Sequence, residues 1–298
     1  MRQVIVPATS ANLGPGFDCA GLCLDVVNTV SYEICSGATQ IRYEGCGAND
    51  LPQDGHNLII CAVNHALDRA GKKILPINLI ATNGIPPSRG LGSSAAAIVA
   101  GLMIGNDLCN GCFSKDDLFL MACEMEGHPD NVAPAIYGGF CLSYKDSSRF
   151  HAKKIIPATN IQVAVAYPHY KTSTKAARKN VPLAVSLADA IHSTVRVGLL
   201  VSGIIENDPV ILKMAMDDCL HQPFRFAMLP GVEKAIAASI SAGSYFAVLS
   251  GSGPSVIAFV DDACAESVGR AMVDAFTLDG ECAEYFLTRP RNKGAEIL

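Results

Sequence analysis

The sequence is poor in charged residues and has no long hydrophobic run. Asp, Glu, Lys and Arg make up 17% of its 298 residues and hydrophobic residues 50%, a balance that argues against extensive disorder. The apolar run at 197–205 (VGLLVSGII) is too short to span a membrane. The apolar positions near the N-terminus are too few for a signal peptide before Pro7 interrupts them. We therefore expect a cytoplasmic protein with no membrane partner.

Two further binding patterns are missing. The net charge is −5 and no cluster of Lys and Arg with interleaved aromatic residues occurs, so we expect no nucleic-acid partner. Several of the twelve cysteines lie inside apolar segments, which is typical of reduced, buried thiols. The one CxxC pair, Cys109 and Cys112, has no second pair at zinc spacing, and its Asn-Gly centre indicates a turn. An anionic ligand would therefore be held by helix ends, backbone amides, individual arginines or a metal.

Hydrophobic periodicity predicts strands and helices in both halves of the chain. We expect strands at 4–6, 26–34, 77–85, 138–144, 161–167 and 283–288, and two more over 244–260 joined by a tight turn. Helices are expected at 58–70, 94–106, 264–276 and over much of 186–242. Asn57 is the expected cap of the first, and Ser114 with Asp117 has the capping-box pattern for a helix that ends at Gly127. With 7–25 as a loop and the polar stretch 146–160 as a crossing, the pattern predicts two α+β domains, 1–156 and 157–298.

The stretch PPSRGLGSSAAAIVAG at 86–101 is the strongest candidate for a binding site. A strand, a glycine-rich turn and a helix in that order direct backbone N–H groups at an anion. Gly90 and Gly92 permit a positive φ and the close approach of an oxyanion, and Ser93 and Ser94 could cap the helix or bind a metal. No lysine precedes the serine pair, so this is not a Walker A loop. Without further context, a simple turn with a helix cap would explain the same residues.

Three motifs together resemble the GHMP kinase superfamily. Pro86–Ala96 matches its ATP-phosphate motif, PATSANLGPGFDCAGLCLD (7–25) its N-terminal motif and VLSGSGPSVIAFV (248–260) its C-terminal motif. The N-terminal motif, with segments 126–140, 172–178 and 222–231, resembles the homoserine kinases in particular. The resemblance implies an N-terminal domain like ribosomal protein S5 domain 2 and a ferredoxin-like C-terminal domain. It also implies ATP, Mg²⁺ and L-homoserine as ligands, a step of threonine biosynthesis, and a homodimer, which family members often form.

The resemblance assigns ATP and metal ligands. ATP would lie on the loop formed by Pro86, Pro87, Ser88, Arg89, Gly90, Leu91, Gly92, Ser93, Ser94, Ala95 and Ala96. Mg²⁺ would be held by Glu124 and the hydroxyl of Ser94. Glu124 follows Leu120 and Met121 by four and three positions, so we expect its carboxylate to face inward, where it needs a partner. A structural salt bridge is the alternative for Glu124, and Glu126 is the less favoured metal ligand.

An amino-acid substrate needs an acceptor for its ammonium group and donors for its carboxylate. Asp18, Asn12 and Asn131 suit the ammonium and hydroxyl groups, and Arg178 and Arg225 suit the carboxylate. The resemblance implies these five residues, with His128 nearby, and catalytic roles for Asp18, Asp130, Asn131 and Arg178. Asp18 or Asp130 could act as general base, or no dedicated base is needed. Two other functions stay open: another GHMP small-molecule kinase, of the mevalonate, shikimate or sugar type, and a non-catalytic GHMP-fold sensor.

Overall fold

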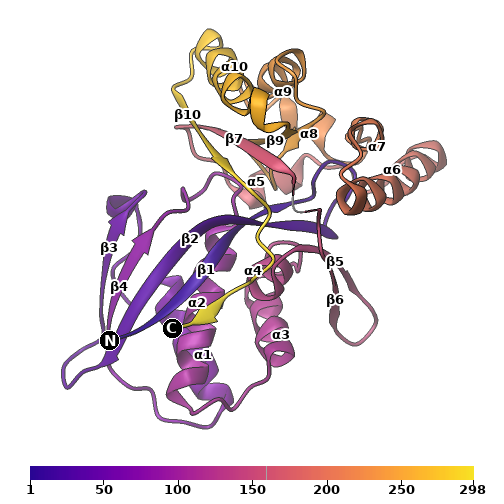
Figure 1. Ribbon diagram of the computed structural model, residues 1–298. Coiled ribbons are helices and arrows are strands. Elements are labelled where there is room, and N and C mark those ends of the chain that lie inside the picture. The colour runs from indigo at the N-terminus through magenta and orange to yellow at the C-terminus, as the bar shows by residue number, and fades with distance from the viewer. Residues whose placement is uncertain (159) are drawn as a thin grey trace.

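A computed structural model describes residues 1–158 and 160–298 and shows two β-sheets, each covered by helices (Figure 1). Strands and helices alternate in both halves, so the α+β prediction is confirmed. The chain begins and ends beside the same sheet, because its last strand returns to the first. This return was not predicted.

The first sheet has seven strands. Its main path is β11–β1–β2–β4–β3, and the hairpin of β5 and β6 pairs with the start of β2. Among the described strands of this sheet, only β3 and β4 pair in parallel. Two expectations are wrong here: the loop expected at 7–25 is confined to residues 12–19, and the polar stretch 146–160 contains a strand. The strands are β1 (Arg2–Ala11), β2 (Ala20–Ile34), β3 (Gln40–Gly45), β4 (Ile77–Asn83), β5 (Phe140–Lys145), β6 (Phe150–Ile155) and β11 (Glu296–Ile297).

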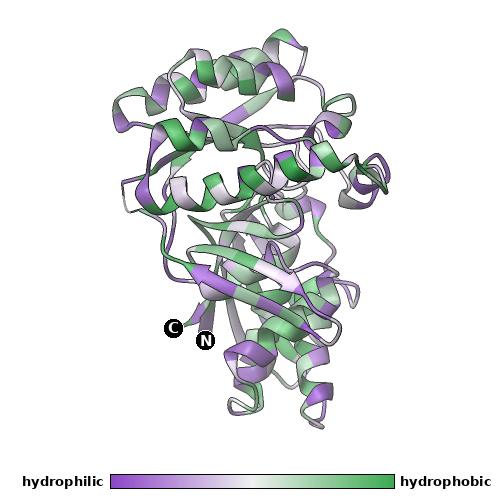
Figure 2. Ribbon diagram, turned by 90° about the vertical axis from the view of Figure 1, so that its right-hand side faces the viewer, coloured by the Kyte–Doolittle hydropathy of each residue, from purple (hydrophilic) through white to green (hydrophobic). Residues whose placement is uncertain are grey.

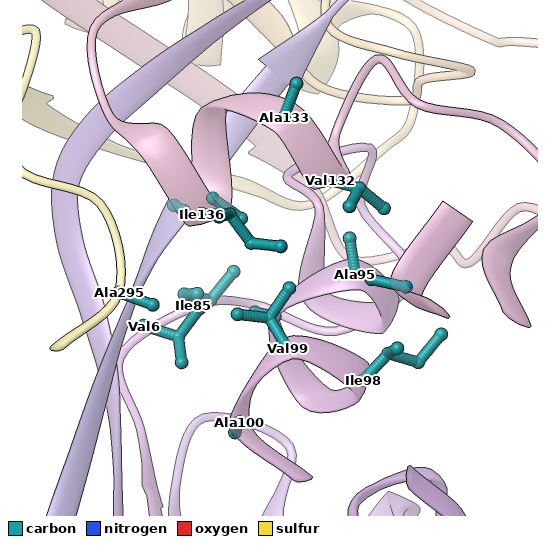
Figure 3. Close-up of a cluster of buried hydrophobic side chains, with 14 of the residues drawn as sticks. Val6, Ile85, Ala95, Ile98, Val99, Ala100, Val132, Ala133, Ile136 and Ala295 are labelled. Carbon is teal, nitrogen blue, oxygen red and sulfur yellow. The ribbon is translucent and has the colours of Figure 1, made fainter. Parts of the chain in front are cut away.

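Four helices accompany this sheet: α1 (Leu58–Arg69), α2 (Ser93–Leu108), α3 (Lys115–Glu126) and α4 (Val132–Tyr137). The Asn57 cap, the Ser114–Asp117 capping box and the stop at Gly127 are confirmed. The small residues of α2 let α1 approach closely, since a Cβ on Gly101 would lie 2.3 Å from the Ile59 carbonyl oxygen. Figure 3 shows α2 side chains packed with α4, β1 and the C-terminal tail in one core.

The second sheet has the order β10–β7–β9–β8, with every pair antiparallel. Numbered within this half, its strands lie in the order fourth, first, third, second, which is the ferredoxin-like arrangement that the resemblance implied. Its strands are β7 (Gln162–Pro168), β8 (Phe246–Leu249), β9 (Val256–Val260) and β10 (Ala283–Thr288). Its helices are α5 (Thr174–Lys179), α6 (Leu187–Glu206), α7 (Pro209–Ala215), α8 (Gln222–Phe226), α9 (Val232–Ser241) and α10 (Ala265–Leu278). Two 3₁₀ turns lie outside these elements, η1 (Ala48–Asp50) in the first half of the chain and η2 (Asp262–Cys264) in the second.

The chain passes from the first sheet to the second between Ile155, the last residue of β6, and Gln162, the first residue of β7. The C-terminal tail crosses back, with Pro290 bridging to Leu24 and β11 pairing with β1. The first sheet therefore holds both ends of the chain. The loops that follow β1, β4 and β8 come from both halves, and they meet at one cavity.

Candidate active site

A cavity of about 510 Å³ lies between the two halves of the molecule. It brings together most of the residues singled out from the sequence. These are Asn12, Asp18, Pro87 to Ser94, Ala96, His128, Asp130, Asn131, Arg178 and Arg225. Pro86, Ala95 and Glu124 do not line it; Glu126 does.

The glycine-rich loop forms one wall of this cavity. Gly90 and Gly92 have φ of 76° and 70°. A Cβ on Gly92 would lie 1.9 Å from the Thr9 hydroxyl oxygen, so no other residue fits there. Gly92 is also the N-cap of α2 and supplies no side chain to the first turn. The N–H groups of that turn and the positive end of the helix dipole are therefore available to an anion.

The second half of the chain holds the back of this loop. Ser255 Oγ donates to the Arg89 carbonyl oxygen at 2.5 Å, and Ser250 Oγ donates to the Gly90 carbonyl oxygen at 2.7 Å. The Gly90 backbone lies so close that a Cβ there would be 2.3 Å from the Ser250 carbonyl oxygen. With both loop carbonyls bound on the far side, the amides of the loop are left to face the cavity.

The structure overturns the expected direction of Glu124. Its side chain is half exposed and pairs with Arg69 at 3.2 Å, as the salt-bridge alternative proposed. Glu126 instead accepts a 2.7 Å hydrogen bond from Ser94 Oγ, and burial raises the pKa of its carboxyl group. The reason is helix geometry: at about 100° per residue, Glu126 falls on the side of Ala122 and Phe119, which are buried, and Glu124 falls opposite them.

Asp130 is buried and accepts three hydrogen bonds. The donors are His128 Nδ1 at 3.0 Å and the backbone and side-chain nitrogens of Asn131 at 2.8 and 3.3 Å. The hydrogen bond to Asp130 raises the pKa of His128. Asn131 Oδ1 accepts in turn from the Thr9 hydroxyl at 2.8 Å. Asp130 thus orients His128 and Asn131 toward the cavity.

Asp18 lies in the loop between β1 and β2 and faces Arg178 of α5. The two side chains form a bidentate ion pair, with N–O distances of 2.6 and 2.9 Å. Asn12 holds the loop by accepting from the Asp18 amide at 3.0 Å and donating to the Gly251 carbonyl oxygen at 2.8 Å. Asn12 and Asp18 both have a positive φ, 68° and 58°, a conformation that costs free energy outside glycine.

Arg225 is buried beside this pair. Its Nη1 donates to the Gly251 carbonyl oxygen at 2.9 Å and to His221 Nδ1 at 3.1 Å. Its Nε, also buried, has no hydrogen-bond partner among the described residues. His221 Nε2 donates to the Gly14 carbonyl oxygen at 2.8 Å, and burial lowers its pKa, so the ring is neutral. The guanidinium carbons of Arg178 and Arg225 lie 5.6 and 5.3 Å from the ring centre of Phe17.

Several residues of the site were ranked low or missed from the sequence. Glu126 was considered but placed below Glu124, although its position on the helix face could have reversed that order. Phe17 and His221 carry no signal of their own, because each acts through a residue distant in the sequence: Phe17 lies beside Arg225, and His221 donates to the Gly14 carbonyl oxygen. The far end of the cavity was also missed. It is lined by Tyr43, Asn57, Asn83, Ala97 and Ala100, among others, and Asn57 Nδ2 donates to the Tyr43 hydroxyl at 2.6 Å.

Within residues 1–158 and 160–298, no group of three or more His, Cys, Asp or Glu side chains could hold a metal ion. All twelve cysteines are free thiols. The cavity therefore offers one anion site at the α2 N-terminus, one carboxylate with a hydroxyl beside it, and a pocket with both an acidic and two basic side chains. This set suits a phosphorylated ligand and a small zwitterion side by side.

Two family models match the chain, the GHMP kinases N terminal domain over residues 57–139 and the GHMP kinases C terminal model over residues 200–277. Together they cover more than half of it. The chain therefore belongs to the GHMP kinase family of ATP-dependent phosphotransferases, and the predicted family and fold are confirmed.

Full-length relatives indicate which group within the GHMP kinase family the chain belongs to. The chain is 37% identical over 298 residues to the homoserine kinase of Desulfitobacterium hafniense, covering 100% of both. It is 39% identical over 295 residues to that of Carboxydothermus hydrogenoformans, covering 99% of this chain and 96% of the relative. The crystal structure of homoserine kinase from Cytophaga hutchinsonii matches with a TM-score of 0.89 at 29% identity, over 100% of this chain and 97% of that one. Within the GHMP kinases, the chain belongs to the homoserine kinases.

Proposed function

We propose that this chain transfers the γ-phosphoryl group of ATP to the side-chain hydroxyl of L-homoserine, and that the cavity residues described above carry the reaction. The observation that supports this most strongly is the Asp18–Arg178 ion pair beside the α2 N-terminus. One carboxylate and one guanidinium next to each other complement the ammonium and carboxylate groups of an amino acid.

ATP places its phosphates on the loop from Gly90 to Ser94, where free amides and the α2 dipole meet the negative charge. The adenosine end then lies toward Tyr43 and Asn57. Mg²⁺ fits the pair of Ser94 and Glu126, because this half-buried carboxylate and the hydroxyl beside it line the cavity and both offer oxygen. When bound there, the metal would neutralise charge on the phosphates.

Homoserine replaces the Asp18–Arg178 ion pair with contacts from its own charged groups. Its carboxylate takes Arg178 together with the unpartnered Nε of Arg225, and its ammonium takes Asp18. His128 and Asn131, held by Asp130, line the side nearest the phosphate loop and contact the hydroxyl. The hydroxyl oxygen bonds to the γ-phosphorus as the bond to the bridging oxygen of ADP breaks, and the hydroxyl proton is released.

Asp130 is a positioning residue rather than the general base. Its carboxylate already accepts three hydrogen bonds and is buried. Asp18 is occupied by the ammonium group. We infer that the proton leaves late, to a phosphate oxygen or water, as a loose transition state permits.

The alternative functions are less well supported. Mevalonate, shikimate and sugars lack an α-ammonium group, so they leave Asp18 unmatched. A non-catalytic sensor would have no need for a metal-binding carboxylate beside Ser94. The cytoplasmic location and the Mg²⁺ requirement stay predictions.

A coupled assay of ADP release tests the proposal. Mg-ATP is supplied with L-homoserine, L-threonine, mevalonate, shikimate or galactose in separate reactions. We expect turnover with homoserine at least about 100-fold above the other alcohols, because a site that binds a substrate's polar groups rejects analogues that lack them. Turnover with a different alcohol would overturn the substrate, and ATP binding without turnover on any alcohol would favour the sensor.

A further inference from the structure

The end of strand β1 lies where the two halves of the molecule meet. The strand starts at the N-terminus and runs toward the second half (Figure 1), and Figure 2 shows the halves one above the other with both chain ends on the lower one. The last residue of the strand, Ala11, accepts a 3.0 Å hydrogen bond from the Gly251 amide of the second half. Two hydroxyl side chains, Thr9 and Ser10, come just before Ala11, and both are fully buried.

The two hydroxyls contact different neighbours, because consecutive residues of a strand point to opposite sides. Ser10 Oγ lies 2.8 Å from Ser250 Oγ of the second half. Thr9 Oγ1 donates to Asn131 Oδ1 at 2.8 Å, at the N-terminus of α4 in the first half. The Thr9 amide also donates to the Leu91 carbonyl oxygen of the phosphate loop at 3.2 Å. Thr9 therefore joins the phosphate loop to a residue that lines the cavity.

The Thr9 hydroxyl lies directly against the backbone of Gly92. A Cβ on Gly92 would be 1.9 Å from Thr9 Oγ1 and 3.1 Å from Asn131 Oδ1, so the three residues converge on one point. Gly92 is the N-cap of α2, where the phosphate-binding amides begin. Because Gly92 and Asn131 are held against the same hydroxyl group, the distance between those amides and Asn131 depends on Thr9.

Two hydrogen bonds fix which atom of the Asn131 amide faces which neighbour. Nδ2 lies 3.3 Å from Asp130 Oδ1, and a carboxylate oxygen only accepts, whereas Oδ1 receives the one hydrogen of the Thr9 hydroxyl. Turned by 180°, the amide would set its oxygen against the carboxylate. Nδ2 carries two hydrogens, and no described residue other than Asp130 accepts from it. Asn131 therefore presents an N–H donor to the cavity that it lines.

We propose that Thr9 is a positioning residue for phosphoryl transfer and acts through Asn131. Thr9 holds the amide so that Nδ2 donates to the hydroxyl oxygen of the substrate, at a set distance from the amides of the phosphate loop. That oxygen has two lone pairs, so one accepts from Nδ2 while the other faces the γ-phosphorus of ATP. This role rests on the function proposed above, since only a chain that phosphorylates an alcohol has such an oxygen to position.

Two substitutions separate the hydroxyl group of Thr9 from its bulk. Thr9→Val has nearly the same shape and removes the donor, so kcat should fall about 10- to 100-fold, the range for a reacting group displaced by up to about 1 Å. The KM for ATP should stay within about threefold of wild type, because the amide bond to Leu91 remains. Thr9→Ser keeps the hydroxyl and should recover most of kcat. Thermal melting with and without Mg-ADP checks that each variant folds and binds nucleotide.

A double-mutant cycle with Asn131→Ala separates positioning from packing. Removal of one such donor costs about 100- to 1,000-fold in rate, which leaves a measurable turnover. In that background Thr9→Val should change kcat by less than about twofold, because the amide through which it acts is gone. Ser10→Ala is the matched control, since it also removes a fully buried hydroxyl, but on the other side of the strand. Its effect on kcat should be equal in both backgrounds, within about twofold.

Each result supports or overturns the role of Thr9. A loss of kcat in Thr9→Val that Thr9→Ser recovers, and that disappears in the Asn131→Ala background, supports it. An equal loss in both backgrounds makes Thr9 a packing residue and overturns it, as does an unchanged kcat in Thr9→Val. Thr9→Ala, which also removes the donor, takes the same place in the cycle if Thr9→Val does not fold.

The cycle also distinguishes this role from the proposed substrate. It is run with whichever alcohol the wild type phosphorylates, so turnover of an alcohol other than homoserine overturns the proposed function and leaves the comparison of Thr9 variants valid. A wild type that phosphorylates no alcohol overturns both.

Discussion

The choice between Glu124 and Glu126 as the metal ligand can be tested with two substitutions on one helix. Glu126→Gln keeps the size and polarity of the side chain and removes the charge beside Ser94, 2.7 Å away. Glu124→Gln makes the same chemical change two residues earlier, where the carboxylate faces solvent and pairs with Arg69. The two variants are a matched comparison, because the same chemical change is made at two positions of the same helix, two residues apart.

The expected effects differ by orders of magnitude. A charged group that acts on the transferring phosphates in a site sheltered from water contributes about 100- to 1,000-fold to the rate, or roughly 3–4 kcal/mol. Glu126→Gln should therefore lower kcat/KM by that factor and raise the Mg²⁺ concentration needed for half-maximal activity. Glu124→Gln removes an exposed ion pair, which stabilises the fold by at most about 1 kcal/mol and touches no ligand. Its kcat/KM should stay within about twofold of wild type, a change of less than 0.5 kcal/mol.

The assay is ADP release with homoserine at varied Mg²⁺, supported by thermal melting with and without Mg-ADP. Wild type and Glu124→Gln should both gain melting temperature from Mg-ADP, and Glu126→Gln should gain much less while melting normally without it. A large loss of activity in Glu124→Gln, with Glu126→Gln unaffected, would refute the helix-face argument. Normal Mg²⁺ dependence in both variants would refute a carboxylate ligand on α3.

Three other predictions concern the rest of the site. Arg225→Lys should raise the KM for homoserine about 10- to 100-fold, the range for a lost hydrogen bond to a charged group, and leave the KM for ATP unchanged in initial-rate assays. Ser255→Ala removes the hydroxyl hydrogen bond to the Arg89 carbonyl oxygen and leaves only the Ser255 backbone N–H as its donor from this segment; it should raise the KM for ATP about fivefold, with a smaller effect on homoserine, and equal effects on both would contradict its assigned role. Burial lowers the pKa of His221 from 6.5, so the unfolded chain takes up a proton first and the free energy of unfolding should fall as the pH drops below 6.5. Urea titrations should show this fall reduced in His221→Gln, and an unchanged pH dependence would exclude His221 as its source.

The parts of the fold that depend on neighbouring residues could be predicted from the sequence. The Ser114–Asp117 capping box, the Asn57 cap and the stop at Gly127 each act within one turn of a helix. The glycine-rich loop could also be predicted, because its strand, turn and helix follow one another directly in the sequence. All these signals involve neighbouring residues, so they can be recognised from the sequence alone.

The parts that were missed depend on distant contacts. Val4 pairs with Ile297, almost the whole chain away, and a two-residue strand has no periodicity to reveal it. β6 was read as a crossing because its residues are polar, but it pairs with β5 at the edge of the sheet, where polar residues are tolerated. The Glu124 error arose differently. Its neighbours three and four positions earlier were taken as core, whereas the buried arc of the helix as a whole lies on the side of Glu126.

The segment Ser250–Ser255 explains why the two halves make one site. Ser250 and Ser255 hold the carbonyls of the phosphate loop, and the Gly251 carbonyl oxygen between them accepts from both Asn12 and Arg225. Both ligand pockets are therefore built on the same few backbone atoms. In the complex proposed above, a shift of this segment would move the loop amides and Arg225 together, so a misplacement of about 1 Å there would reduce the rate without removing a direct ligand contact.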